Sequence, residues 1–222
     1  FAIAIDTGED GEALTSFLHQ RRISLDALVL THLHADHAAG VAALVESRIP
    51  VARCYLPWDA EKSLVDEEVL AALEQLRSTG TEIVYVARGD EIILPSGKLT
   101  VLWPERDRAR PNQDANLYSM ALLAELHGST MLLTGDLEGA YEMYAAAPAD
   151  VLKAAHHGSE SSTSPAFLQA VAPQLLLLSC GSEERSASME ARRGDIPMAD
   201  TSANGAVTIN FEPDGFTVET MR

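Results

Sequence analysis

The sequence contains few cysteines, few aromatic residues and no long apolar run. Cys54 and Cys180 are its two cysteines, and both lie in apolar runs, so we interpret them as small core residues rather than as a disulfide or a pair of metal ligands. No apolar run approaches the roughly 20 residues that a membrane-spanning helix needs. No basic, apolar leader opens the chain, whose first residues, 1–5, read as a strand, so we expect it to be part of a longer protein.

Basic residues are also scarce. There are 16 lysines and arginines against 33 acidic residues, and the net charge of −17 argues against nonspecific binding of nucleic acid through a broad basic surface. No stripe of aromatic and basic residues offers stacking for single strands. A phosphate substrate stays compatible with this charge, because divalent ions supply local positive charge. With 46% apolar residues, the chain is predicted to form a single globular domain over residues 1–222.

The sequence does contain a cluster of side chains that bind metals. It comprises His32, His34, Asp36 and His37. The cluster follows the apolar run 26–30, which is typical of a buried strand, and precedes a small-residue segment that predicts a helix. Because strand side chains alternate, His32 and His34 can point to one side and share one ion. Asp36 and His37 then begin the helix and can serve a second ion, where the carboxylate shifts the preference from zinc toward manganese.

Two further strand ends carry polar residues. Asp136 follows the apolar run 131–133, and His156 and His157 follow the run 151–155. Lys153 lies within that second run, where it can contact a phosphate or stand as a solvated edge residue. The serines after His157, beginning with Ser159, can donate hydrogen bonds to a phosphate or cap the helix that starts near Pro165.

The apolar periodicity predicts an α/β chain with mixed sheets flanked by helices. An antiparallel meander is expected in the middle of the chain, with strand and helix alternating before and after it. Strands are predicted over residues 1–6, 26–31, 51–56, 82–86, 91–94, 99–103, 117–126, 130–133, 150–155, 174–179, 206–211 and 216–220. Helices are predicted over residues 12–22, 36–47, 61–78, 137–146 and 164–171.

These motifs resemble those of the metallo-β-lactamase superfamily. The shared pattern is the segment His32-x-His34-x-Asp36-His37, an aspartate after Thr-Gly at Asp136, and a late histidine. More narrowly, the segments 6–8, 132–136, 150–159 and 179–181 are similar to the hydrolase domain of ComEC-type DNA-uptake channel proteins. The superfamily resemblance covers essentially the whole chain. It implies a four-layer αββα sandwich with a dinuclear metal site at the sheet edges.

The resemblance further implies which residues bind the ions, which are Mn²⁺ or Zn²⁺. The implied ligands are His32, His34, Asp36, His37, Asp136 and His156. Asp136 would lie between the two ions and, with Asp36, hold ions and water for catalysis. Either His156 or His157 would complete the shell of the second ion. We favour His156 as the ligand and His157 as a catalytic partner that contacts the substrate phosphate or transfers a proton.

The sequence departs from the superfamily in two places. Many members place a further histidine between the first cluster and Asp136, whereas that region here offers Asn112, Asn116 and Ser119, as the Asn/Ser motif of ComEC-like sequences does. We assign Asn116, Ser119 and the later Ser159 to substrate binding, and expect the ion of His32 and His34 to be weakly held, which favours a harder metal such as manganese. ComEC-like domains also carry an Asn and a Gly-His-Pro after residues 179–181, which are absent from the interval 182–189.

The first functional hypothesis is a metal-dependent nuclease that acts on single-stranded DNA during uptake in natural transformation. The ComEC resemblance implies this substrate and a place at the extracytoplasmic face of the bacterial membrane. The second hypothesis is hydrolysis of a lactam, lactone or thioester on the same metals, and the third is a non-catalytic domain that guides DNA. Because the chain is acidic, we expect the remainder of a membrane channel and a separate DNA-binding domain as partners of a monomeric chain.

Overall fold

The structure, a computed structural model, describes residues 1–106 and 113–221. The chain folds into two compact units. Unit 1 contains Phe1–Arg88 and Pro104–Met120, and unit 2 contains Gly89–Trp103 and Ala121–Arg222. The chain therefore enters unit 2, returns to unit 1 and enters unit 2 again. The expectation of a single domain stays a prediction.

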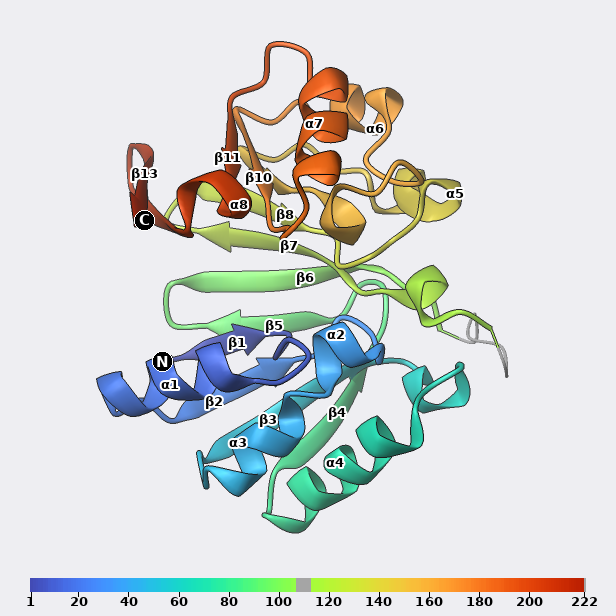
Figure 1. Ribbon diagram of the computed structural model, residues 1–222, viewed down its shortest axis with the longest axis vertical. Coiled ribbons are helices and arrows are strands. Elements are labelled where there is room, and N and C mark those ends of the chain that lie inside the picture. The colour runs from blue at the N-terminus through green and yellow to red at the C-terminus, as the bar shows by residue number, and fades with distance from the viewer. Residues whose placement is uncertain (107–112, 222) are drawn as a thin grey trace. The chain divides into compact units, whose positions relative to one another are not determined.

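Unit 1 is built on a parallel sheet of four strands in the order β1-β2-β3-β4 (Figure 1). Its strands are β1 (Ile3–Ile5), β2 (Leu25–Val29), β3 (Val51–Pro57) and β4 (Glu82–Val86). Its helices are α1 (Glu12–Arg21), α2 (Ala35–Ala38), α3 (Val41–Glu46) and α4 (Glu67–Ser78). Leu18, Leu44 and Leu73, on α1, α3 and α4, pack in one core with Leu28 and Cys54 of the sheet. Burial raises the pKa of the Cys54 thiol to about 12, as expected for a core cysteine.

Unit 2 is built on a sheet of seven strands in the order β11-β10-β9-β8-β7-β6-β5. The first four along the chain are β5 (Glu91–Leu94), β6 (Gly97–Trp103), β7 (Ala121–Leu126) and β8 (Ser129–Leu133). They form the predicted antiparallel meander. The remaining three are β9 (Val151–Lys153), β10 (Leu175–Leu178) and β11 (Met198–Asp200). These continue the sheet in parallel from β8, as the alternation of strands and helices predicts.

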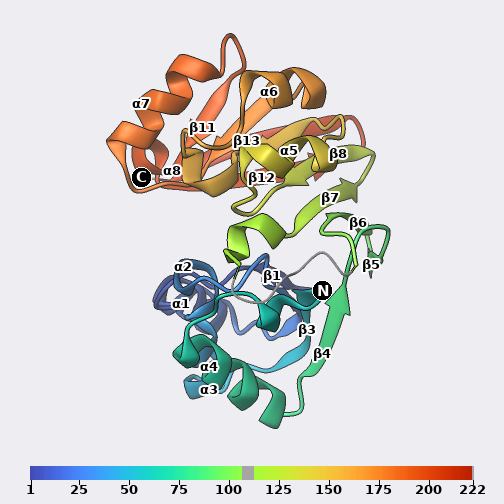
Figure 2. The same cartoon turned by 90° about the vertical axis from the view of Figure 1, so that its right-hand side faces the viewer.

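The two faces of the unit 2 sheet have different covers (Figure 2). The helices of this unit are α5 (Gly139–Glu142), α6 (Pro165–Val171), α7 (Glu183–Arg192) and α8 (Thr201–Asn204), and a ribbon of β12 (Ala206–Glu212) and β13 (Gly215–Met221) closes the chain. Leu152 packs with Phe167 of α6 and Met189 of α7. Its neighbour Val151 packs with Phe216 of the ribbon, because successive strand side chains point to opposite faces.

Several predicted elements differ from the structure at their ends. The helix expected over 61–78 begins at Glu67, after a separate 3₁₀ turn at Ala60–Lys62. The strand expected over 117–126 begins at Ala121, because Asp114 accepts a hydrogen bond from the Asn116 amide and starts a 3₁₀ turn over Ala115–Tyr118. The helix expected over 137–146 is divided between α5 and a 3₁₀ turn at Met143–Ala145.

The helix expected over 36–47 is two helices, α2 and α3, separated by Ala39 and Gly40. The amide of Gly40 donates to the carbonyl of Gly8 at 2.9 Å instead of continuing the helical ladder. A Cβ on Gly40 would lie 2.7 Å from backbone atoms of Gly11. The small residue therefore permits a close contact between two backbone segments.

Gly40→Ala is expected to destabilise the protein by about 1–3 kcal/mol, the usual cost of forcing extra volume into a packed site. Urea unfolding followed by circular dichroism measures this loss. The matched control is Gly181→Ala, because a Cβ on Gly181 meets no atom within 4 Å. Equal unfolding midpoints for both variants would show that the Gly40 contact relaxes freely.

The strand order brings the predicted site residues to strand ends. In unit 1, Asp6 follows β1, and the histidine segment follows β2. In unit 2, Asp136 follows β8, and His156 and His157 follow β9. Neighbouring parallel strands end at the same edge of their sheet, so each unit gathers its polar residues at the carboxyl ends of its strands. Within the described residues, no helix has both the length and the apolar character of a membrane span.

Candidate metal centre

Asp6 fixes the histidine segment of unit 1. Its Oδ1 accepts a hydrogen bond from the Thr31 amide at 2.7 Å, and its Oδ2 accepts from the Thr31 hydroxyl at 2.9 Å. The same Oδ2 lies 2.7 Å from Nδ1 of His37, whose ring is buried. This contact turns the other ring nitrogen of His37, Nε2, to within 3.9 Å of Asp36. A carboxylate behind a histidine ring is the arrangement that orients metal-binding histidines.

His32 and His34 are held by polar neighbours from two parts of unit 1. Nδ1 of His32 lies 3.1 Å from the Thr31 hydroxyl and 3.4 Å from the Ser119 hydroxyl. Nε2 of His34 lies 3.4 Å from Oδ1 of Asp114, a half-exposed side chain that the sequence reasoning did not single out. Ser119, predicted to contact substrate, is thus placed directly behind a predicted metal ligand.

His32, His34 and Asp36 form one potential ligand group. Each offers a ligand atom, and these atoms lie within 4.8 Å of one another. A tetrahedral zinc ion with ligands at about 2.0–2.1 Å holds them about 3.4 Å apart, so small side-chain movements would close this group on one ion. The prediction paired Asp36 with His37 alone, whereas the structure sets the Asp36 carboxylate near His32 and His34 as well as near His37.

Asn116 belongs to the region between the first cluster and Asp136 where the superfamily resemblance leads us to expect a further histidine. Its side chain is buried, and its Oδ1 accepts no hydrogen bond within the part of the chain that the structure describes. An amide oxygen buried in this way is costly unless a ligand or an ion completes it. Asn112, the other asparagine considered, lies outside the described residues.

Asp136 is a buried acid of unit 2, with 2% of its side chain exposed. Its Oδ2 lies 3.7 Å from Nε2 of His156, and its Oδ1 lies 3.6 Å from Nε2 of His157. The sequence reasoning named all three residues, and unit 2 brings them together. The sequence analysis did not name Glu138, whose Oε1 lies 3.7 Å from Nδ1 of His156.

The two histidines of unit 2 differ in their second ring nitrogen. Nδ1 of His157 lies 2.9 Å from the carbonyl oxygen of Ser179. A carbonyl only accepts hydrogen bonds, so Nδ1 carries the proton and Nε2, on the side of Asp136, keeps a lone pair for a metal. His156 instead has a carboxylate near each nitrogen. Both residues have left-handed backbones, with φ of 47° and 51°.

Lys153 and Ser159 occupy different settings. The ammonium nitrogen of Lys153 is buried and has no hydrogen-bond partner among the described residues, which is unusual for a cation. Ser159 shares a hydrogen bond with the Ser161 hydroxyl at 3.0 Å. The helix-capping alternative holds for Ser164, which accepts a hydrogen bond from the Phe167 amide at the start of α6.

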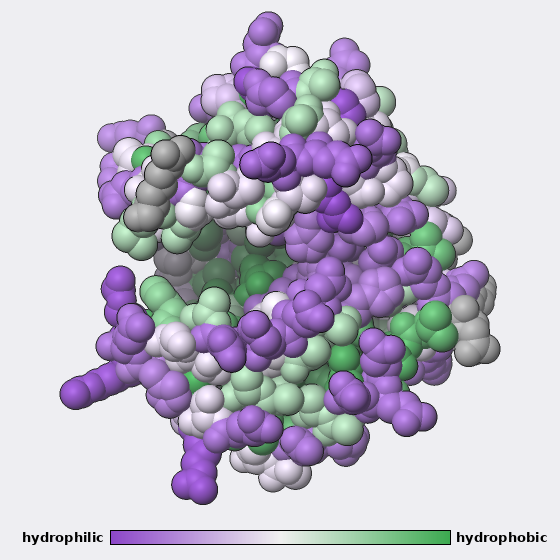
Figure 3. Space-filling model, in the orientation of Figure 1, coloured by the Kyte–Doolittle hydropathy of each residue, from purple (hydrophilic) through white to green (hydrophobic). Residues whose placement is uncertain are grey.

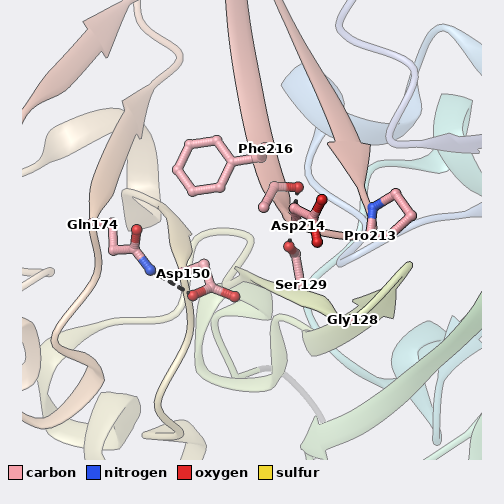
Figure 4. Close-up of a pocket in the computed structure, with 8 residues that line it drawn as sticks. Gly128, Ser129, Asp150, Gln174, Pro213, Asp214 and Phe216 are labelled. Atoms are coloured by element: carbon pink, nitrogen blue, oxygen red, sulfur yellow. Dashed lines mark hydrogen bonds between the residues drawn. The ribbon is translucent and has the colours of Figure 1, made fainter.

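A separate cavity lies at the other end of the unit 2 strands (Figure 4). Asp150 and Gln174, which line it, precede β9 and β10, and Asp214 belongs to the turn of the ribbon. The Asp150 carboxylate accepts hydrogen bonds from the Thr130 amide and hydroxyl and from the Gln174 side chain. The Asp150 carboxylate therefore holds the amino ends of the strands together. The predicted metal ligands of unit 2 lie at the opposite, carboxyl ends of the same strands.

Two curated relatives match most of the chain. The chain is 34% identical over 214 residues to ComE operon protein 3 of Bacillus subtilis, which covers 90% of this chain and 26% of that protein. It is 25% identical over 240 residues to Competence protein ComA of Neisseria gonorrhoeae, covering 99% of this chain and 31% of that protein. The chain thus spans about a quarter to a third of the length of these relatives.

The fold prediction is confirmed by the solved structures. The metallo-beta-lactamase fold protein YhfI of Bacillus subtilis matches 90% of this chain and 85% of its own, with 15% identity and a TM-score of 0.56. A sequence profile described as the Metallo-beta-lactamase superfamily matches residues 2–182. This fold implies a metal-dependent hydrolase, and the histidine and aspartate groups fit divalent ions. The chain belongs to the metallo-β-lactamase superfamily.

Proposed function

We propose that the chain is a metal-dependent phosphodiesterase that cleaves single-stranded DNA during DNA uptake. The observation that carries this proposal is the donor set of unit 1, in which a carboxylate stands beside two histidines. Asp36 lies with His32 and His34, and the buried Asn116 oxygen lacks a hydrogen-bond partner in the described chain. Oxygen-rich sets favour harder ions such as Mn²⁺. The relative named a competence protein supports DNA as the substrate.

The proposed ligands are His32, His34, Asp36, His37, Asp136 and one histidine of the pair that follows β9. When bound, two divalent ions make water a nucleophile near neutral pH and stabilise the attacking and leaving oxygens of a phosphodiester. Asp6 keeps the His37 ring in one orientation through its 2.7 Å contact. Because Asp136 is buried, its carboxylate stays shielded from bulk water and available to ions.

Of the two unit 2 histidines, His157 is the better ligand. Its Nδ1 is tied to the Ser179 carbonyl, which fixes the ring and the tautomer that a ligand needs. This assignment replaces the sequence-based preference for His156. His156, near Asp136 and Glu138, is then placed to hold or transfer a proton.

Lys153 and Asn116 are the proposed contacts of the substrate phosphate. The buried ammonium of Lys153 has no hydrogen-bond partner in the described part of unit 2, so an anion would supply one. Asn116 would donate to the phosphate through its side-chain NH₂, and its backbone N–H donates to the Asp114 carboxylate at 2.9 Å. Ser119 acts behind His32, and Ser159 lies on the loop that carries the histidines.

The charge of the chain argues for help in binding DNA. Hydrophilic residues are prominent on the face drawn in Figure 3, and hydrophobic residues gather there in smaller groups. With a net charge of −17, such a surface repels a phosphate backbone. The proposal therefore places this monomeric chain as the hydrolase portion of a longer membrane channel, at its extracytoplasmic face, with a separate DNA-binding partner.

The test is a cleavage assay on end-labelled single-stranded DNA. The chain is stripped with a chelator and reloaded with Mn²⁺, Zn²⁺ or Mg²⁺, and bound metal is quantified in parallel. Cleavage is expected to disappear on chelation and return most strongly with Mn²⁺. Thioester or lactam turnover by a loaded chain that leaves DNA intact would replace the proposal with acyl hydrolysis. A chain that binds no metal and cleaves nothing would favour a DNA-guiding role.

A further inference from the structure

Helix α7 contacts the loop that carries the two histidines of unit 2. This loop, residues 155–164, is called the histidine loop below. The guanidinium of Arg192 donates to the carbonyl oxygens of Gly158, Ser159 and Ser162, at 2.8, 3.1 and 2.6 Å. Arg185, two turns earlier on the same helix, donates to the carbonyl of His156 at 3.1 Å. Two arginines therefore bind four carbonyls of one irregular segment.

The backbone of the histidine loop needs such support. His156, His157 and Thr163 have positive φ angles of 47°, 51° and 53°. Non-glycine residues in this region are strained, and they persist only where surrounding contacts determine the conformation. Within the loop, the Ser159 amide donates to the His156 carbonyl and the Ser162 amide donates to the Ser159 carbonyl, at 2.9 and 3.2 Å. Arg192 adds donors to the carbonyls of Gly158 and Ser162.

The helix that supplies these arginines is itself firmly anchored. Met189, between Arg185 and Arg192, is fully buried in the core with Phe167 and Leu178. The Ser182 side chain caps the first turn by accepting from the Arg185 amide. Close packing continues at Gly158, where a Cβ would lie 2.8 Å from Leu178. The arginine side chains thus extend from a fixed helix onto a strained loop.

We infer that Arg192, assisted by Arg185, is a positioning residue that holds the histidine loop in its metal-binding conformation. It acts on backbone carbonyls, so it touches neither substrate nor ion. The inference rests on the proposed function in one respect, because it takes a histidine of this loop as a metal ligand. It adds that residues 182–189 form the cap and most of α7, the helix whose arginines hold this loop.

The test measures Mn²⁺ binding to the full chain by electron paramagnetic resonance, which counts bound ions and gives a Kd for each. Arg192→Ala is expected to weaken the binding of one of the two ions by about 10- to 100-fold, the usual effect of removing a residue that supports a metal ligand. The Kd of the other ion should not change. The affinity of Arg192→Lys for that ion should lie between those of the wild type and Arg192→Ala, since one ammonium cannot reach three carbonyls in the same geometry. Added guanidinium should restore part of the affinity of Arg192→Ala.

The matched control is Arg193→Ala. Arg193 is the next residue of the helix region, but it binds Glu190 and the carbonyls of Gly194 and Ile196 instead of the histidine loop. It should keep wild-type Kd values for both ions. Wild-type Kd values for both ions in folded Arg192→Ala would overturn the inference. So would unfolding of both Arg192 variants, which would make the residue a support of the whole fold.

The same titration separates the two proposals. A wild-type chain that binds both ions but leaves DNA intact, with weakened binding in Arg192→Ala, would remove the nuclease and keep the positioning role. A wild-type chain that cleaves DNA while Arg192→Ala binds both ions normally would do the reverse. A wild-type chain without a second Mn²⁺ would overturn both.

Discussion

Asp136→Asn is expected to reduce Mn²⁺-dependent cleavage of single-stranded DNA by more than about 100-fold, beyond the loss typical for a residue one step behind a metal ligand. Asparagine keeps the size of the side chain and removes its charge. Because Asp136 is 2% exposed and faces both histidines of unit 2, water cannot readily replace the lost carboxylate oxygen. The cleavage rate at saturating Mn²⁺, together with the number of bound ions, measures the effect.

The matched control is Asp214→Asn, which removes the same charge from the turn of the ribbon. Asp214 lines the cavity at the amino ends of the unit 2 strands, so this variant should cleave DNA at the wild-type rate. Circular dichroism spectra should match for both variants and the wild type. Retention of cleavage by Asp136→Asn would show that this aspartate is not needed for the reaction. It would also contradict the interpretation of Asp136, His156 and His157 as part of a metal site.

The arrangement of strands and the acids and histidines at their ends could be predicted from the sequence because the signals are local. An apolar run followed by a polar residue marks a strand end, and parallel neighbours bring such ends to one edge. Asp136 and His157 were found in this way, and unit 2 places them 3.6 Å apart between side-chain atoms. The antiparallel meander was equally local, since turn residues separate its short strands.

The residues that orient the proposed metal ligands could not be predicted, because their contacts join positions that are distant in sequence. Asp6 is separated from His37 by 31 positions, and no periodic pattern links them. Gly40 interrupts a helical pattern because its amide bonds to Gly8, a tertiary contact that overrides local propensity. Helix α7 was missed for another reason: Met189 is its one buried residue, so the sequence has no apolar stripe to mark it.

His157→Ala is expected to lose more than about 100-fold of the cleavage rate, while His156→Ala loses about 10-fold or less, because only the first removes a proposed ligand. The comparison is well matched. Both residues have nearly equal positive φ angles, 47° and 51°, and both lie near Asp136. The backbone cost of alanine in the left-handed region is therefore similar in the two variants and cancels in their ratio.

The number of bound ions shows whether each loss of cleavage rate comes from a lost metal ligand. His157→Ala should bind one Mn²⁺ fewer, since the Ser179 carbonyl that oriented the ring is no ligand itself and cannot take its place. His156→Ala should keep both ions. Its pH–rate profile should lose one of its two limbs, as expected if the His156 ring holds or transfers a proton beside Glu138. The reverse order, with an ion lost from His156→Ala, would restore His156 as the ligand and leave the hydrogen bond of His157 to Ser179 as a support of the loop alone.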